Sequence, residues 1–213
     1  MICVALQESN VNKCLQILKS VEMAEIRIDL AKLSENDVAK IFSESPKKLI
    51  ATCRPDNYSD GQRLKLLKTA ISSGAAYVDI EIESTKEFTQ ELIIFAKQHN
   101  TKVIISYHNY EITPETSELL SIRKTCFSLG ADIAKIATMV HTVQDNARLL
   151  ALYDTDKKVV VLGMGSIGKL TRVIASFLGS PFTFAAFDAA SATAPGQMTA
   201  DQLKKIKEQM AKL

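Results

Sequence analysis

The chain has 213 residues, of which 46% are hydrophobic and 23% charged, and its formal net charge is only +2. A charge so near neutrality argues against a dedicated nucleic-acid or membrane-surface binder. The four cysteines Cys3, Cys14, Cys53 and Cys126 have no paired spacing, which predicts reduced thiols in the cytoplasm rather than a zinc site or a disulfide framework. The chain opens without a basic leader, and no apolar run reaches the roughly 18 residues that cross a bilayer, so we expect neither export nor a membrane partner.

Apolar runs of strand length alternate with amphipathic segments of helical length along the chain. The predicted strands are 2–6, 23–29, 49–54, 77–81, 103–108, 133–138, 159–164 and 182–187, and the predicted helices are 10–20, 35–43, 61–73, 85–99, 114–129, 143–153, 167–178 and 199–212. Strict alternation predicts parallel strands joined by right-handed crossovers. Eight such units favour an α/β fold of the (β/α)₈ TIM barrel type, and we expect one catalytic domain over residues 1–213.

Polar residues gather on one face of the predicted strands. In an open sheet covered by helices both faces are apolar, whereas a barrel turns one face of every strand inward. Most of the polar residues fall toward the carboxyl ends of their strands, where barrel enzymes hold their active sites. Buried ion pairs with a purely structural role are the alternative, but so many buried charges are costly unless they serve a ligand. The polar set comprises Glu25, Arg27, Asp29, Thr52, Arg54, Asp79, Glu81, Glu83, Ser106 and His108.

A single lysine, Lys135, lies in the middle of the apolar segment 131–138. Loss of solvation there would lower its pKa toward the range in which a free amine attacks a carbonyl to form a Schiff base. An edge-protecting or snorkelling lysine is the structural alternative. His108 closes the neighbouring predicted strand, and an imidazole accepts and returns a proton near neutrality. Together the two residues predict imine chemistry with an acid–base partner.

Five motifs in a fixed order carry a family resemblance. They are Glu25-Ile26-Arg27-Ile28-Asp29, Thr52-Cys53-Arg54, Ser106-Tyr107-His108-Asn109-Tyr110, Asp132-Ile133-Ala134-Lys135-Ile136-Ala137 and Ala194-Pro195-Gly196-Gln197. The ordered set spans most of the chain and resembles type I 3-dehydroquinate dehydratase. The resemblance implies a homodimeric (β/α)₈ barrel that converts 3-dehydroquinate to 3-dehydroshikimate in the shikimate pathway, with no cofactor and no metal.

The resemblance also implies roles for individual residues. Lys135 would form the imine with the substrate ketone, and His108 would take a proton from the adjacent carbon and return one to the departing hydroxyl. Arg172 matches the arginine that holds the substrate carboxylate, and Gln197 lies in the loop expected to close over the substrate. The other matched substrate contacts are Glu25, Arg27, Arg54, Met164 and Phe184.

The sequence departs from the family pattern at two of these places. The family commonly pairs its histidine with a glutamate shortly after the Thr-x-Arg motif, whereas the segment after Arg54 is longer and carries aspartate, so Asp60 is the expected partner of His108. The loop serine of the family is replaced, so Thr193 would supply its hydroxyl, with Ser191 as an open alternative.

Two rival activities fit parts of the sequence. Gly163, Gly165 and Gly168 form a GxGxxG pattern after a predicted strand, and Asp188 follows about 20 residues later, as in an NAD(P)-dependent dehydrogenase. Only one predicted helix follows Asp188, so the remaining nucleotide-binding strands have no sequence to form from. A class I Schiff-base aldolase is the closer rival because it also uses a strand lysine, although such enzymes often bind a phosphate. A barrel that binds a polyol acid without catalysis is a third alternative.

Overall fold

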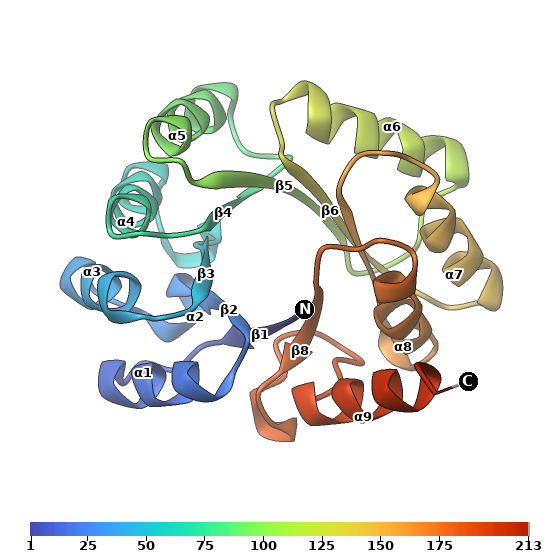
Figure 1. Cartoon of the computed structure of the whole chain (residues 1–213). Coiled ribbons are helices and arrows are strands. Elements are labelled where there is room, and N and C mark those ends of the chain that lie inside the picture. Colours follow the sequence, from blue (N-terminus) through green and yellow to red (C-terminus); the bar gives the residue numbers. More distant parts are fainter. Residues whose placement is uncertain (213) are drawn as a thin grey trace.

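The computed structural model describes residues 1–212, so Leu213, the last residue of the expected domain, lies outside the described residues. Eight parallel strands pair in the order β7-β6-β5-β4-β3-β2-β1-β8, and β7 also contacts β8, so the barrel is nearly closed. Figure 1 shows the strands at the centre with the helices around them. The predicted TIM barrel is therefore confirmed. The strands are β1 (Ile2–Leu6), β2 (Met23–Arg27), β3 (Lys48–Thr52), β4 (Tyr77–Glu81), β5 (Lys102–Asn109), β6 (Ile133–Met139), β7 (Val159–Met164) and β8 (Thr183–Ala186).

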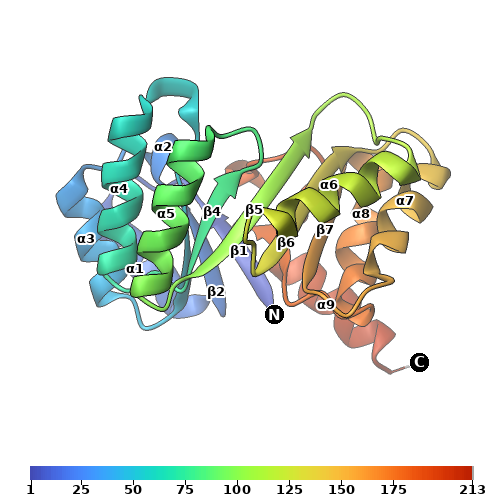
Figure 2. The ribbon, with the colours of Figure 1, turned by 90° about the horizontal axis from the view of Figure 1, so that it is seen from above.

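Short polar caps begin most of the helices that cover the barrel. The Ser59 side chain accepts a hydrogen bond from the backbone N–H of Gln62, and Gln62 Oε1 accepts one from the backbone N–H of Ser59, which is a reciprocal capping box. Figure 2 shows α4 and α5 on one side of the barrel and α7 and α8 on the other. The longer helices are α1 (Val11–Ser20), α3 (Glu35–Glu44), α4 (Asp60–Ser72), α5 (Lys86–Gln98), α6 (Thr116–Ser128), α7 (Val143–Leu150), α8 (Gly165–Ile174) and α9 (Ala200–Met210), with α2 (Ile28–Ala31) and single 3₁₀ turns at 55–57, 151–153, 175–177 and 189–191. No helix within residues 1–212 is long and apolar enough to span a membrane.

Strand alternation separates an apolar shell from an apolar barrel floor. Ala134 and Ile136 of β6 pack in the shell between strands and helices, whereas Ile133 and Ala137 belong to the inner cluster. Within that floor the ring of Tyr77 meets the ring of Phe182 at 5.7 Å between centroids. Lys135 has the same parity as the inner pair, and its side chain is buried inside the barrel, as the alternation predicts.

Three residues of the predicted polar faces lie outside the observed strands: Asp29, Glu83 and Arg54, which follows β3 because that strand ends at Thr52. The second strand ends at Arg27, and Ile28–Ala31 forms the short helix α2, so the prediction that Asp29 lies on the strand is wrong. The physical reason is a local ion pair: the Asp29 carboxylate accepts hydrogen bonds from Arg27 Nε at 3.1 Å and Nη2 at 2.6 Å, which turns the chain back on itself. Glu83 follows β4 and is exposed.

The glycine pattern at the end of β7 and the start of α8 brings two segments of backbone into contact. A β carbon built on Gly168 would lie 2.5 Å from the carbonyl carbon of Gly163, so these two glycines let α8 pack closely against β7, and the strands close into a barrel instead of the open sheet that binds a dinucleotide. Asp188 is the N-cap of the turn at 189–191 and accepts hydrogen bonds from the backbone N–H groups of Ala190 and Ser191. The pattern therefore serves strand–helix packing, and the dehydrogenase prediction has no structural support.

Candidate active site

A cavity of about 180 Å³ opens at the carboxyl ends of the strands. It brings together Lys135, His108 and every substrate contact predicted from the sequence, while Asp60 is not part of its wall. The open alternative Ser191 lines a different cavity, beside α1. The wall of the main cavity comprises Glu25, Arg27, Arg54, Asp56, Glu81, His108, Tyr110, Lys135, Ala137, Leu162, Met164, Arg172, Phe184, Thr193, Ala194 and Gln197.

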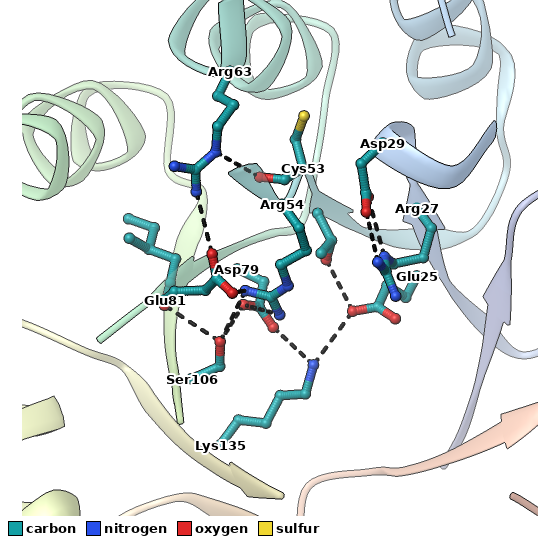
Figure 3. Close-up of polar contacts among 12 residues, drawn as sticks. Glu25, Arg27, Asp29, Cys53, Arg54, Arg63, Asp79, Glu81, Ser106 and Lys135 are labelled. Atoms are coloured by element: carbon teal, nitrogen blue, oxygen red, sulfur yellow. Dashed lines mark hydrogen bonds and ion pairs between the residues drawn. The ribbon is translucent and has the colours of Figure 1, made fainter. Parts of the chain in front are cut away.

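Lys135 lies in a layer of side chains contributed by the even-numbered strands. Its Nζ lies 2.9 Å from Asp79 Oδ2, 3.4 Å from Glu25 Oε1 and 4.5 Å from the centroid of the Phe184 ring (Figure 3 shows the two ion pairs). Such four-residue layers from alternate strands fill TIM barrels. The strand around Lys135 is apolar, as its sequence indicates, but two buried carboxylates from β2 and β4 hold the amine itself.

Asp79 connects the lysine to Arg54 and Ser106. Its Oδ1 accepts hydrogen bonds from Arg54 Nη2 at 2.9 Å and from Ser106 Oγ at 2.6 Å, and only 2% of Asp79 is exposed (Figure 3). Burial acts to raise the pKa of the Asp79 carboxyl, but Arg54 and Lys135 outweigh it and hold that pKa well below its usual range. Asp79 is therefore ionised throughout the neutral range and keeps Lys135 in place.

His108 is the second-last residue of β5 and lies above the lysine. In the β5–β6 register Ser106 pairs with Lys135 and His108 pairs with Ala137, so the imidazole lies one inward step nearer the barrel mouth than the amine. Burial, followed by the positive charges of Arg54 and Lys135, holds the pKa of His108 well below 6.5. The imidazole is therefore neutral at physiological pH and able to accept a proton.

Arg172 is a buried cation without a carboxylate partner among residues 1–212. The residue is 1% exposed, its Nη1 donates to the backbone oxygen of Phe184 at 3.2 Å, and its Nε has no hydrogen-bond partner. Burial lowers the pKa of the guanidinium to about 10, so the group remains charged at neutral pH. A buried charge without compensation is costly, which points to an anionic ligand at this end of the cavity.

Thr193 and Gln197 reach the cavity from the loop after β8. Gln197 Oε1 accepts hydrogen bonds from the backbone N–H of Thr193 at 2.7 Å and from its hydroxyl at 3.2 Å. Ser191 is occupied elsewhere, since its hydroxyl donates to the backbone oxygen of Asp188. Of the two hydroxyls that the sequence left open, Thr193 is the one on the cavity wall.

Among residues 1–212, Asp60 makes no hydrogen bond to the His108 ring. It starts α4, where its Oδ1 accepts a hydrogen bond from Arg63 Nη1 at 3.0 Å, while Arg63 Nε donates to the backbone oxygen of Cys53 (Figure 3 shows Arg63 and Cys53). The lengthened segment after Arg54 thus directs this carboxylate to Arg63. Both Asp60 and His108 do line a second cavity, on the outer side of the imidazole.

Sequence reasoning gave no role to Asp79, although it lies at the centre of the site. The available signal was its inward parity on β4, which places it in the layer of Lys135. Asp56, Glu81 and Tyr110 on the cavity wall were also not assigned. Parity alone ranks all inward polar residues equally, so it did not distinguish Asp79 from its neighbours.

A family model and sequence relatives of this chain carry the same description. The chain matches the model of the family described as type I 3-dehydroquinase over residues 2–213. It is 39% identical over 220 residues to the 3-dehydroquinate dehydratase of Methanocaldococcus jannaschii, covering 97% of each chain, and 37% identical over 219 residues to that of Methanococcus maripaludis strain C7, covering 97% of this chain and 98% of the relative.

Solved structures agree with this match. The type I 3-dehydroquinate dehydratase of Clostridium difficile, crystallised with covalently modified comenic acid, superposes with a TM-score of 0.87 at 26% identity, covering 99% of this chain and 92% of that one. The 3-hexulose-6-phosphate synthase of Salmonella typhimurium superposes with a TM-score of 0.64 at 17% identity, over 99% of this chain and 98% of that one, which shows a common fold alone.

Proposed function

The chain belongs to the type I 3-dehydroquinase family, and we propose that Lys135 and His108 carry out the reaction of that family, the dehydration of 3-dehydroquinate to 3-dehydroshikimate. The observation that carries this assignment is one cavity holding a buried amine, a neutral imidazole and an unpaired guanidinium. These groups match a substrate with a ketone, an acidic neighbouring C–H and a carboxylate. Neither the aldolase nor the dehydrogenase alternative agrees with the family.

The proposed reaction begins at the ketone carbon. Lys135 Nζ, freed of a proton, attacks this carbon, and loss of one water from the carbinolamine gives an iminium. His108 then accepts the proton of the neighbouring C2, and the electron pair of that C–H bond moves into the iminium, which becomes a neutral enamine. His108 returns the proton to the C1 hydroxyl as the C–O bond breaks, so a second water leaves. Addition of one water to the regenerated iminium frees the product and Lys135.

The remaining residues are proposed to orient the substrate. Arg172 binds the carboxylate as a charge-assisted hydrogen-bond donor, which would satisfy its open Nε. Glu25, Arg27 and Arg54 contact the ring hydroxyls and the carboxylate, while Met164 and Phe184 form apolar walls. Asp60 and His108 line the second cavity together, and we propose that Asp60 influences His108 across that cavity without a direct hydrogen bond. Holding the reacting carbon near both Lys135 and His108 supplies much of the rate by orientation.

Borohydride trapping tests this chemistry most directly. Reduction in the presence of 3-dehydroquinate should attach a substrate-derived adduct to the peptide that contains Lys135 and abolish activity, as read by mass spectrometry. Lys135→Met should give no adduct, whereas Lys102→Met, which removes an exposed lysine on the same barrel, should give the full adduct. An unmodified Lys135 peptide under turnover, or an adduct on another lysine, would rule out the imine at this position.

We also propose that the enzyme is a cytoplasmic homodimer. Val143 on α7 and Ile167 and Leu170 on α8 are large apolar side chains with exposed fractions of 68%, 41% and 51%, on helices that pack against each other. An apolar face of this kind suits a second copy of the chain. Sedimentation equilibrium should give twice the 23.4 kDa chain mass, and Leu170→Asp should shift it toward the monomer. A wild-type monomer at micromolar concentration would contradict the proposal.

A further inference from the structure

The turn between β7 and α8 supports the loop that follows β8. The backbone N–H of Gly165 donates a hydrogen bond to the backbone oxygen of Pro195 at 3.1 Å. A β carbon built on Gly196 would lie 2.2 Å from the backbone oxygen of Gly165 and 2.6 Å from its carbonyl carbon. The two backbones therefore touch, and only a glycine at position 196 permits the approach. Gly165 itself has φ +80° and Gly196 has φ +73°, a region that other residues rarely adopt.

The same loop is anchored a second time at its far end. The backbone N–H of Ala186 donates to the backbone oxygen of Met198 at 2.9 Å, and Ala186 and Thr199 form a parallel bridge. Thr193 and Gln197 lie around the first anchor, and both side chains line the main cavity. The loop is thus held at the mouth of the main cavity at both of its ends.

The amide of Gln197 has its orientation determined by this loop. A backbone N–H can only donate, so the hydrogen bond from the Thr193 backbone N–H requires the Gln197 oxygen at that place. The NH₂ group of Gln197 is therefore the end that remains for a ligand. An NH₂ group on the wall that also holds Arg172 selects a hydrogen-bond acceptor, such as a carboxylate oxygen.

We propose that Gly165 and Gly196 are positioning residues, whose backbone contact docks the loop so that the Gln197 NH₂ group meets an acceptor oxygen of the substrate. The identity of that substrate rests on the proposed function, whereas the docking contact does not. The glycine pattern that spans the end of β7 and the start of α8 thus has two separate uses, since Gly163 and Gly168 pack the strand against its helix and Gly165 contacts the loop.

Two substitutions at position 196 separate crowding from backbone strain. Gly196→Ala introduces a β carbon and an unfavourable φ, whereas asparagine tolerates a positive φ, so Gly196→Asn introduces mainly the β carbon. Gly179→Ala is the matched control, because Gly179 has φ +92° but no atom within 4 Å of its added β carbon. If crowding at Gly165 matters, both variants at 196 lose function and Gly179→Ala keeps it.

Hydrogen exchange of the Gly165 amide in the ligand-free protein, followed by NMR, reads the contact directly. We expect slow exchange in the wild type, in Gly179→Ala and in Gln197→Ala, and exchange at least 10-fold faster in both variants at position 196. A Gly165 amide that exchanges at the unprotected rate in the wild type would overturn the proposal without any variant being needed.

Kinetics then tests the link to Gln197. We expect kcat/KM to fall by about 10- to 100-fold in Gly196→Asn and in Gln197→Ala, mainly through KM, which corresponds to roughly 1.4 to 2.8 kcal/mol. The double variant should lose no more than the worse single variant, because both changes remove one interaction. Fully additive losses of kcat/KM in the double variant would refute the positioning role. A Gly196→Asn variant with the wild-type exchange rate at the Gly165 amide and the wild-type KM would refute it as well. Failure of borohydride trapping would instead refute the proposed chemistry and leave the exchange result intact.

Discussion

Replacement of Arg172 by methionine should stabilise the protein while it removes most of the activity. The shift of the Arg172 pKa from 12.5 to about 10 corresponds to a free-energy cost of roughly 3 kcal/mol for burying the charged guanidinium at neutral pH. The hydrogen bond from Arg172 Nη1 to the Phe184 backbone oxygen stabilises the folded state by about 2 kcal/mol and offsets part of this cost. Arg172→Met should therefore raise the free energy of unfolding by about 1 kcal/mol and the Tm by roughly 2 to 4 °C.

The same change should abolish binding of the substrate carboxylate. Two charge-assisted hydrogen bonds of about 1.5 to 3 kcal/mol each are lost, so kcat/KM should fall by roughly 10² to 10⁴. Urea unfolding monitored by circular dichroism and steady-state kinetics measure the two effects on the same sample. An Arg172→Met variant that is clearly less stable than the wild type, or that keeps the wild-type kcat/KM, would refute the inference that Arg172 is an uncompensated buried charge that binds the substrate carboxylate.

Arg63→Met is the matched control for this experiment. Arg63 is also buried, at 3% exposed, but it is fully paired with the Cys53 oxygen, with Asp60 at 3.0 Å and with Glu81 at 3.5 Å. Loss of these partners should lower the free energy of unfolding by about 2 to 4 kcal/mol, somewhat below the range for a fully buried pair because Asp60 is half-exposed. Opposite signs of the stability change at two buried arginines would identify Arg172 as the one reserved for a ligand.

Three further results are expected. His108→Ala should keep substrate binding, seen by calorimetry, and lose about 10² to 10⁴ in kcat; an unchanged rate would remove His108 from the mechanism. Because burial holds the pKa of His108 well below 6.5 in the free enzyme, its imidazole should stay neutral as the pH falls to 6.5, which NMR titration of the His108 ring signals measures; a titration midpoint above pH 7 would contradict this. Asp79→Asn leaves Arg54 and Lys135 without their shared carboxylate and should lower the free energy of unfolding by about 3 to 5 kcal/mol in urea titrations, whereas the exposed Asp156→Asn should have almost no effect.

The barrel and the positions of the two residues proposed to react, Lys135 and His108, could be predicted from the sequence because both depend on local patterns. The alternation of strands and helices gives parallel pairing, and residue parity within a strand decides which side chains point inward. Lys135 and His108 occupy inward positions on consecutive strands, and consecutive strands of a barrel are neighbours. Their meeting in one cavity followed from these rules, and the family motifs supplied Arg172 and Gln197.

Partner choice among the buried charges was decided only by the tertiary structure. Parity could not show that Lys135 pairs with Asp79 and Glu25 rather than lying among apolar groups, since those carboxylates come from β4 and β2, across the barrel. Nor could it show that Asp60 turns to Arg63 or that, within residues 1–212, the Nε of Arg172 has no hydrogen-bond partner. Side-chain direction along a strand has a fixed period of two residues, so sequence determines it. Which charges meet depends on distances of a few ångströms between separate strands and loops, and these distances exist only once the chain has closed into a ring.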